Sequence, residues 1–221
     1  MKLEVLDSSG KTVNEIEVDD AVFAIDPNEP VVHQTLLAQL AARRSGSANT
    51  KSRGDIRGST RKLHRQKGLG MARAGSANSP TRRGGGVAFG PKQRSYEQRL
   101  PKRMRRLAIR SVLSSRVNEA RLTVLDDLTL ENPSTRVIAE MIKKTEVGRS
   151  VLIVVGKSDR VVYRSARNLP GIDVLPADTL NVADMLAHGA LLVTVDAIRR
   201  IEALWGSARQ SDHRKKAMVE A

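Results

Sequence analysis

The sequence predicts an α/β protein with a parallel sheet of about four strands, flanking helices, an N-terminal β-hairpin and a long extended basic loop inserted in the domain. Three observations predict this fold. Short apolar runs alternate with helical segments after residue 119. Apolar and polar positions alternate on both sides of a turn within residues 2–18. Between these two regions, residues 45–95 lose all periodicity and become rich in Gly, Lys and Arg.

The first 44 residues predict the N-terminal part of a globular domain. Residues 2–18 are typical of two short strands joined by a turn at Ser8–Lys11. Asp26, followed by Pro27 and by Glu29 three residues after the Asp, indicates the start of a helix. Apolar residues then recur at helical spacing, so the helix is expected to end near residue 44.

Residues 45–95 predict an extended loop without a core of its own. This stretch holds ten of the 16 glycines, twelve Lys and Arg, one acidic residue and only six large apolar residues. So little apolar surface cannot offset the loss of conformational entropy on folding. Because so long a loop in a compact domain is usually functional or disordered, we expect a partner to order it.

Residues 96–206 predict the rest of the globular α/β domain. Helical periodicity returns at Pro101. Strands are expected at 122–125, 151–155, 172–175 and 190–195. Helices are expected at 133–144 with Asn132 as the N-cap, then at 159–168, 182–188 and 197–205. The strands lack polar alternation, which is typical of parallel strands covered on both faces and joined by right-handed crossovers. Residues 207–221 predict a disordered tail.

The positive charge is confined to one third of the chain. The net charge is +14, but residues 41–110 hold 20 Lys and Arg against two acids, a local net charge of +18. The other 151 residues hold 18 bases and 22 acids and sum to −4. A helical wheel of the segment near Pro101 also separates an apolar face from a basic stripe formed by Arg99, Arg103, Arg106 and Arg110. This segregation predicts a polyanion-binding element.

The residues that enzymes and metal sites require are missing from the pattern. The chain has no Cys, and its four His lie far apart in sequence. Gly156-Lys157-Ser158 follows an apolar strand like the end of a phosphate-binding loop, but position 151, where that loop needs a Gly, is Val. We therefore expect a plain turn there, and neither catalysis nor a cofactor nor a metal.

The longest aliphatic run, residues 151–155, is far too short to cross a membrane, and the N-terminus does not resemble a secretory signal. We therefore expect a cytoplasmic protein without a membrane partner. Only five residues are aromatic, which argues against sheet surfaces on which bases stack and favours recognition of phosphates and shape. A solvated basic linker would explain the charge but not the Gly-anchored basic strings, and composition alone leaves DNA possible.

Long strings in the basic region resemble a known family. They are RQKGLGMARAGS at 65–76, SPTRRGGGVAFGPKQRSY at 79–96 and LPKRMRRLAIRSVLSSR at 100–116, with further likeness at 31–44 and 165–202. Together they are similar to the ribosomal protein L4 family of the bacterial large subunit over about residues 3–206. The departures are His64, where the family usually has Trp, and Leu69 and Met71, which replace a more polar residue and an Arg.

The resemblance implies a structural constituent of the large ribosomal subunit, a primary rRNA-binding protein that helps early assembly. Its extended loop would form part of the wall of the polypeptide exit tunnel. The implied partners are large-subunit rRNA, neighbouring large-subunit proteins and the nascent polypeptide, without homo-oligomers. The alternative is a regulatory RNA-binding protein outside the ribosome, such as a repressor of its own operon.

The predicted interface combines the loop with the basic stripe. The rRNA contacts are expected from Lys51, Arg53, Arg57, Arg61, Lys62, His64, Arg65, Gln66, Lys67, Arg73, Arg82, Arg83, Gly84, Gly85, Gly86, Lys92, Arg94, Arg99, Lys102, Arg103, Arg106 and Arg110. By resemblance, the tunnel-facing tip comprises Lys62, His64, Arg65, Lys67, Leu69 and Met71.

Overall fold

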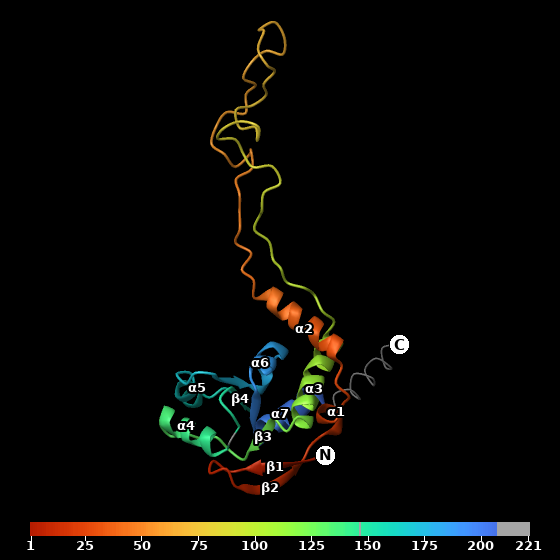
Figure 1. Cartoon of the computed structure of the whole chain (residues 1–221), viewed down its shortest axis with the longest axis vertical. Coiled ribbons are helices and arrows are strands. Elements are labelled where there is room, and N and C mark those ends of the chain that lie inside the picture. Colours follow the sequence, from red (N-terminus) through yellow and green to blue (C-terminus); the bar gives the residue numbers. More distant parts are fainter. Residues whose placement is uncertain (146, 207–221) are drawn as a thin grey trace. The chain divides into compact units, whose positions relative to one another are not determined.

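The chain folds into two compact units, which we call the body and the arm (Figure 1). The computed structural model describes residues 1–145 and 147–206, so the predicted disordered tail at 207–221 lies outside the described residues. The body comprises residues 1–40 and 99–206, and the arm comprises residues 41–98.

The body is built on one six-stranded sheet in the order β2-β1-β3-β6-β4-β5. The strands are β1 (Lys2–Leu6), β2 (Thr12–Glu17), β3 (Leu122–Leu125), β4 (Val151–Val155), β5 (Ile172–Pro176) and β6 (Ala190–Thr194). Only the pairing of β1 with β2 is antiparallel, which confirms the predicted hairpin and mostly parallel sheet. The sheet has six strands rather than four because β1 also pairs with β3, where Val5 lies opposite Val124.

The helices lie close to where the sequence predicted them, with small differences at their ends. They are α1 (Asp20–Phe23), α2 (Glu29–Ala42), α3 (Lys102–Asn118), α4 (Thr135–Lys144), α5 (Arg160–Ala166), the 3₁₀ turn η1 (Ala177–Thr179), α6 (Val182–Ala187) and α7 (Val195–Trp205). Helix α2 begins after Asn28, whose Oδ1 accepts from the Val31 amide at 3.1 Å, rather than after Asp26. Helix α4 begins after Ser134 rather than Asn132. Helix α1 was not predicted, because one turn is too short to set up a periodic pattern.

Helices cover both faces of the sheet, as the apolar strands predicted. Side chains alternate along each central strand, so Leu152 and Val154 of β4 join one apolar cluster while Ile153 joins the other. The first cluster packs against α1, α3, α6 and α7, and the second against α4 and α5 (Figure 1). All five residues of β4 are buried. No described helix is long and apolar enough to cross a membrane.

Candidate nucleic-acid interface

The arm consists of two limbs, residues 41–61 and 75–98 on either side of the tip at 62–74, that bind each other through backbone hydrogen bonds without forming strands. The Thr50 amide donates to the Pro91 carbonyl at 3.0 Å, and the Val87 amide donates to the Lys51 carbonyl at 2.9 Å. Nearer the tip, the Leu63 amide donates to the Gly75 carbonyl at 3.0 Å. The limbs therefore run side by side from the base of the arm to its tip (Figure 1).

An aromatic ring in contact with two guanidinium groups marks the base of the arm. The guanidinium carbons of Arg44 and Arg94 lie 3.8 Å and 4.7 Å from the centre of the Tyr96 ring. A hydrogen bond with Arg94, together with the positive charge of Arg44, lowers the pKa of the Tyr96 hydroxyl. Gly46 is required here, since its φ is +60° and a Cβ would lie 2.0 Å from the Arg94 carbonyl oxygen.

One carboxylate joins the two limbs further along. Asp55 Oδ2 accepts from Lys92 Nζ at 2.8 Å and from the Ser52 amide at 2.9 Å. Lys92 Nζ also donates to the Thr50 carbonyl at 2.8 Å. The hydrogen bond from Lys92, followed by those from Ser52, holds the pKa of Asp55 well below its usual range. A lowered carboxyl pKa means that this contact is complete above the unfolded pKa and is lost only as the pH falls through the folded one.

Substituting Asp55 is expected to loosen the limbs without affecting the body. Asp55→Asn should speed deuterium exchange of the 50–55 segment several-fold at neutral pH, because the neutral amide loses the charge-assisted bond with Lys92 and keeps only one accepting oxygen. Glu97→Gln, at the other acid of the arm, is the matched control and should leave exchange unchanged. In the native chain the Asp55 carboxyl should titrate below the ordinary aspartate range. An ordinary pKa, or equal exchange in the two variants, would contradict the assigned contact.

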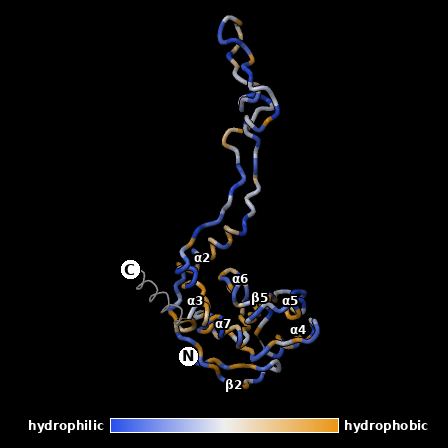
Figure 2. Tube along the Cα trace, turned by 180° about the vertical axis from the view of Figure 1, so that it is seen from behind, coloured by the Kyte–Doolittle hydropathy of each residue, from blue (hydrophilic) through white to orange (hydrophobic). Residues whose placement is uncertain are grey.

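The arm presents its cations to solvent and contributes nothing to the apolar core. All twelve Lys and Arg between residues 45 and 95 are exposed. The buried apolar residues of the described chain all lie in the body, and Figure 2 shows the arm as mainly hydrophilic. Among the predicted glycines, Gly84 is exposed, Gly85 is half-buried and Gly86 is buried, where a Cβ would lie 2.2 Å from the Arg53 amide nitrogen. The predicted cations of both limbs are therefore exposed along two segments that backbone hydrogen bonds hold together.

The tip of the arm is closed by local contacts. Arg65 Nη2 donates to the Gly68 carbonyl at 2.9 Å, and Lys62 Nζ donates to Gln66 Oε1 at 2.5 Å. Gly68 has a φ of +82°, which glycine adopts without strain. His64 is half-buried. Exposed tip residues are Lys62, Arg65, Lys67, Leu69 and Met71.

The side chains of the predicted basic stripe are exposed at its N-terminal end and half-buried at its C-terminal end. Arg99 and Arg103 are exposed, as is Lys102, whereas Arg106 and Arg110 are half-buried. Arg110 Nη1 donates to the Ala21 carbonyl at 3.3 Å, so this side chain packs against α1. Burial, followed by the positive charge of Arg106, lowers the pKa of Arg110. Arginine nevertheless stays charged at neutral pH.

Sequence reasoning missed two exposed residues of the basic region, Arg105 and Phe89. Arg105 is exposed on α3 but falls beside Val112 on the helical wheel, outside the narrow stripe. Phe89 is fully exposed in the arm at a φ of +53°. A strained, exposed aromatic among cations is a candidate contact for an RNA base. The sequence signal that could have identified Phe89 is its position in a Gly-rich basic string.

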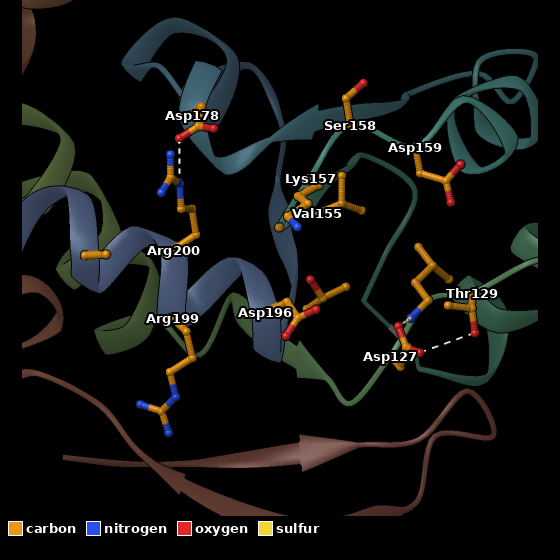
Figure 3. Close-up of a pocket in the computed structure, with 14 residues that line it drawn as sticks. Asp127, Thr129, Val155, Lys157, Ser158, Asp159, Asp178, Asp196, Arg199 and Arg200 are labelled. Atoms are coloured by element: carbon orange, nitrogen blue, oxygen red, sulfur yellow. Dashed lines mark hydrogen bonds and ion pairs between the residues drawn. The ribbon is translucent and has the colours of Figure 1, made fainter.

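A pocket of about 750 Å³ lies at the carboxyl ends of the parallel strands, where α/β proteins commonly bind ligands (Figure 3). Its charged side chains are largely engaged with the protein itself. Arg200 Nε donates to Asp178 Oδ1 at 2.8 Å, and Asp127 accepts from Thr129 at 3.3 Å. Gly156-Lys157-Ser158 is a turn between β4 and α5, as predicted. Within residues 1–145 and 147–206, no group of three or more His, Asp or Glu could hold a metal ion.

Body and arm together define a class of protein, an α/β domain whose positive charge lies mainly on an inserted irregular arm. The family model described as "Ribosomal protein L4/L1 family" matches residues 16–204, and the chain belongs to that family.

The curated relatives that carry the name "Large ribosomal subunit protein uL4" include the following three. The one from Dehalococcoides mccartyi is 44% identical, over 93% of this chain and 98% of the relative. Those from Heliobacterium modesticaldum and Syntrophomonas wolfei are each 45% identical, over 91% of this chain and 97% of the relative. The family resemblance seen in the sequence is confirmed.

Proposed function

We propose that the chain is a structural constituent of the large ribosomal subunit that binds rRNA during early assembly, with the arm as its main RNA-binding element. The observation that carries this proposal is the array of twelve exposed cations on an arm that contains no buried apolar residue. Such an arm has no apolar driving force for compaction, and a folded polyanion supplies both counter-charge and shape. The chain would act in the ribosome of the cytoplasm, and the proposal assigns it no catalytic step.

The two limbs fit contact with RNA on both sides of the arm. The ladder of backbone hydrogen bonds holds the limbs together, and the Lys and Arg side chains of both limbs are exposed, where surrounding phosphates can contact them. Glycines let the backbone approach the RNA closely. Neighbouring large-subunit proteins are the remaining structural partners of the proposal.

The tip is proposed to form part of the wall of the polypeptide exit tunnel. Leu69 and Met71 are 45% and 65% exposed, and the cations Arg65 and Lys67 lie beside them in sequence. A surface that mixes cations with apolar side chains can contact both rRNA and a passing nascent polypeptide. His64 is half-buried and would support the tip rather than contact that polypeptide.

The affinity for rRNA is expected to depend steeply on salt. If six to ten phosphates are neutralised, affinity for a large-subunit rRNA fragment should fall by about 10³-fold to 10⁵-fold between 50 and 200 mM salt. The double substitution Arg82→Gln with Arg83→Gln should flatten the log–log slope by about 0.9 for each phosphate contact removed. Filter binding across a salt series measures both.

The matched control is Arg160→Gln with Arg164→Gln, which removes two exposed cations from α5 of the body. This control should leave the slope unchanged. A fall of less than about tenfold over the same salt range would rule out the phosphate-contact mechanism, because even six contacts predict a far steeper loss.

A further inference from the structure

We propose that a pocket in the body binds a single unstacked nucleotide of RNA, with the base on Trp205 and the phosphate on cations of α3. This inference rests on the proposed rRNA-binding function and adds to it a specific contact outside the arm. The pocket has a volume of about 300 Å³ and lies between α2, α3 and the end of α7. That volume is at the lower end of the range for ligand pockets, which suits one nucleotide rather than an oligomer.

The cations on one side of the pocket have no acidic partner among the residues that the structure describes. Lys102, Arg105 and Arg106 line it, and none of the three forms an ion pair with any described residue. The one carboxylate in the lining, Asp178, is already engaged by Arg200 at 2.8 Å. Arg106 also lowers the pKa of Arg110, so cations repel one another at this end of α3. A phosphate would relieve this repulsion and accept charge-assisted hydrogen bonds.

The other side of the pocket is aromatic and apolar. Trp205 is half-buried at the end of α7, and Ile109 and Leu180 line the pocket with it. An indole is the best side-chain surface on which a base can stack, and stacking does not require a particular base. Gln39 is held in place because its Oε1 accepts from the Ala183 amide at 2.9 Å, which leaves its amide nitrogen to donate to a base or sugar.

The combination favours a nucleotide over other anions. An inorganic phosphate or an acidic peptide would satisfy the cations but leave the indole surface without a stacking partner. A ribonucleotide carries a phosphate and a planar base one sugar apart, and the pocket offers cations and an aromatic ring within one small volume. The small number of aromatic residues argued against a sheet surface on which several bases stack. A pocket for one nucleotide needs only a single aromatic ring.

The test uses the full chain, in which Trp205 is the sole tryptophan and therefore reports on this pocket alone. Titration with a short oligoadenylate is expected to quench Trp205 fluorescence. Inorganic polyphosphate and polyglutamate at matched charge should compete at the arm but leave the fluorescence nearly unchanged, because neither can stack. Arg105→Gln should shift the quenching midpoint about tenfold higher, since it removes one charge-assisted hydrogen bond. Arg164→Gln, an equally exposed cation on α5, is the control and should not shift it.

Each other outcome overturns the nucleotide site. Equal fluorescence changes with polyphosphate would make the pocket a simple anion site, and equal changes with polyglutamate would make it a protein-docking site. No change with oligoadenylate would show that no base reaches Trp205. If rRNA binding kept its steep salt dependence in that case, the proposed function would stand while this inference failed.

Discussion

Arg116→Met is expected to lower the free energy of unfolding of the body by several kcal/mol, since each buried carbonyl left without its donor costs about 1–3 kcal/mol. Arg116 lies on α3 and is 7% exposed. Its Nη2 donates to the carbonyls of Met185 at 3.0 Å and His188 at 2.9 Å, and its Nη1 donates to that of Gly189 at 3.4 Å. These carbonyls belong to the last turn of α6 and to the two residues that follow it, so one guanidinium supplies donors that this helix end lacks. Urea denaturation followed by circular dichroism measures the loss.

The control for this prediction is Arg121→Met. Arg121 shares the carboxylate of Glu119 with Arg116, each at 3.3 Å, but its side chain is 57% exposed. A surface ion pair is worth at most about 1 kcal/mol, so the control should change stability little. Arg116→Lys should fall between the two, because an ammonium lacks the planar fork that reaches several carbonyls. Equal losses at positions 116 and 121 would contradict the role assigned to the buried guanidinium.

The strands could be predicted because their burial leaves a local signal. Residues of β4 and β6 are buried on both faces, and such strands are continuous apolar runs in the sequence. The pairing of β1 with β3 could not be predicted. Val5 and Val124 are more than one hundred residues apart, and the local sequence of a strand does not indicate which other strand it pairs with. Helix ends shifted by one to three residues because Asn, Ser and Asp near each start all make suitable caps.

The charged interface likewise has features that could be predicted from the sequence and features that could not. Exposure of the arm cations follows from composition, since a segment with so few apolar residues has nothing to bury them against. The burial of Arg110 against α1, in contrast, depends on a helix that the sequence did not reveal. The pocket that joins Lys102 to Trp205 depends on the packing of α3 against the end of α7. Contacts of this kind come from tertiary structure and leave no periodic pattern.

Replacing residues 51–90 by a short Gly-Ser linker is expected to abolish incorporation into the large subunit while the body still folds. The linker can be short because the Thr50 amide already contacts the Pro91 carbonyl at 3.0 Å. All buried apolar residues of the described part of the chain lie in the body, so its unfolding transition should be retained. The replacement removes ten of the fourteen Lys and Arg of the arm, which should greatly weaken rRNA binding and flatten its salt dependence. Sucrose-gradient analysis of cells that carry only this variant measures incorporation.

A second variant separates charge from shape in this experiment. A chain that keeps every glycine of the arm but carries Gln at the same ten cations retains the ladder of backbone hydrogen bonds, since these bonds use no charged side chain. If RNA recognises the charge of the arm, this variant should lose incorporation into the subunit to the same extent as the linker variant. Normal assembly of the Gln variant would show that the arm is held by its shape alone. Normal assembly of the linker variant would show that the body, and not the arm, is the main RNA-binding element.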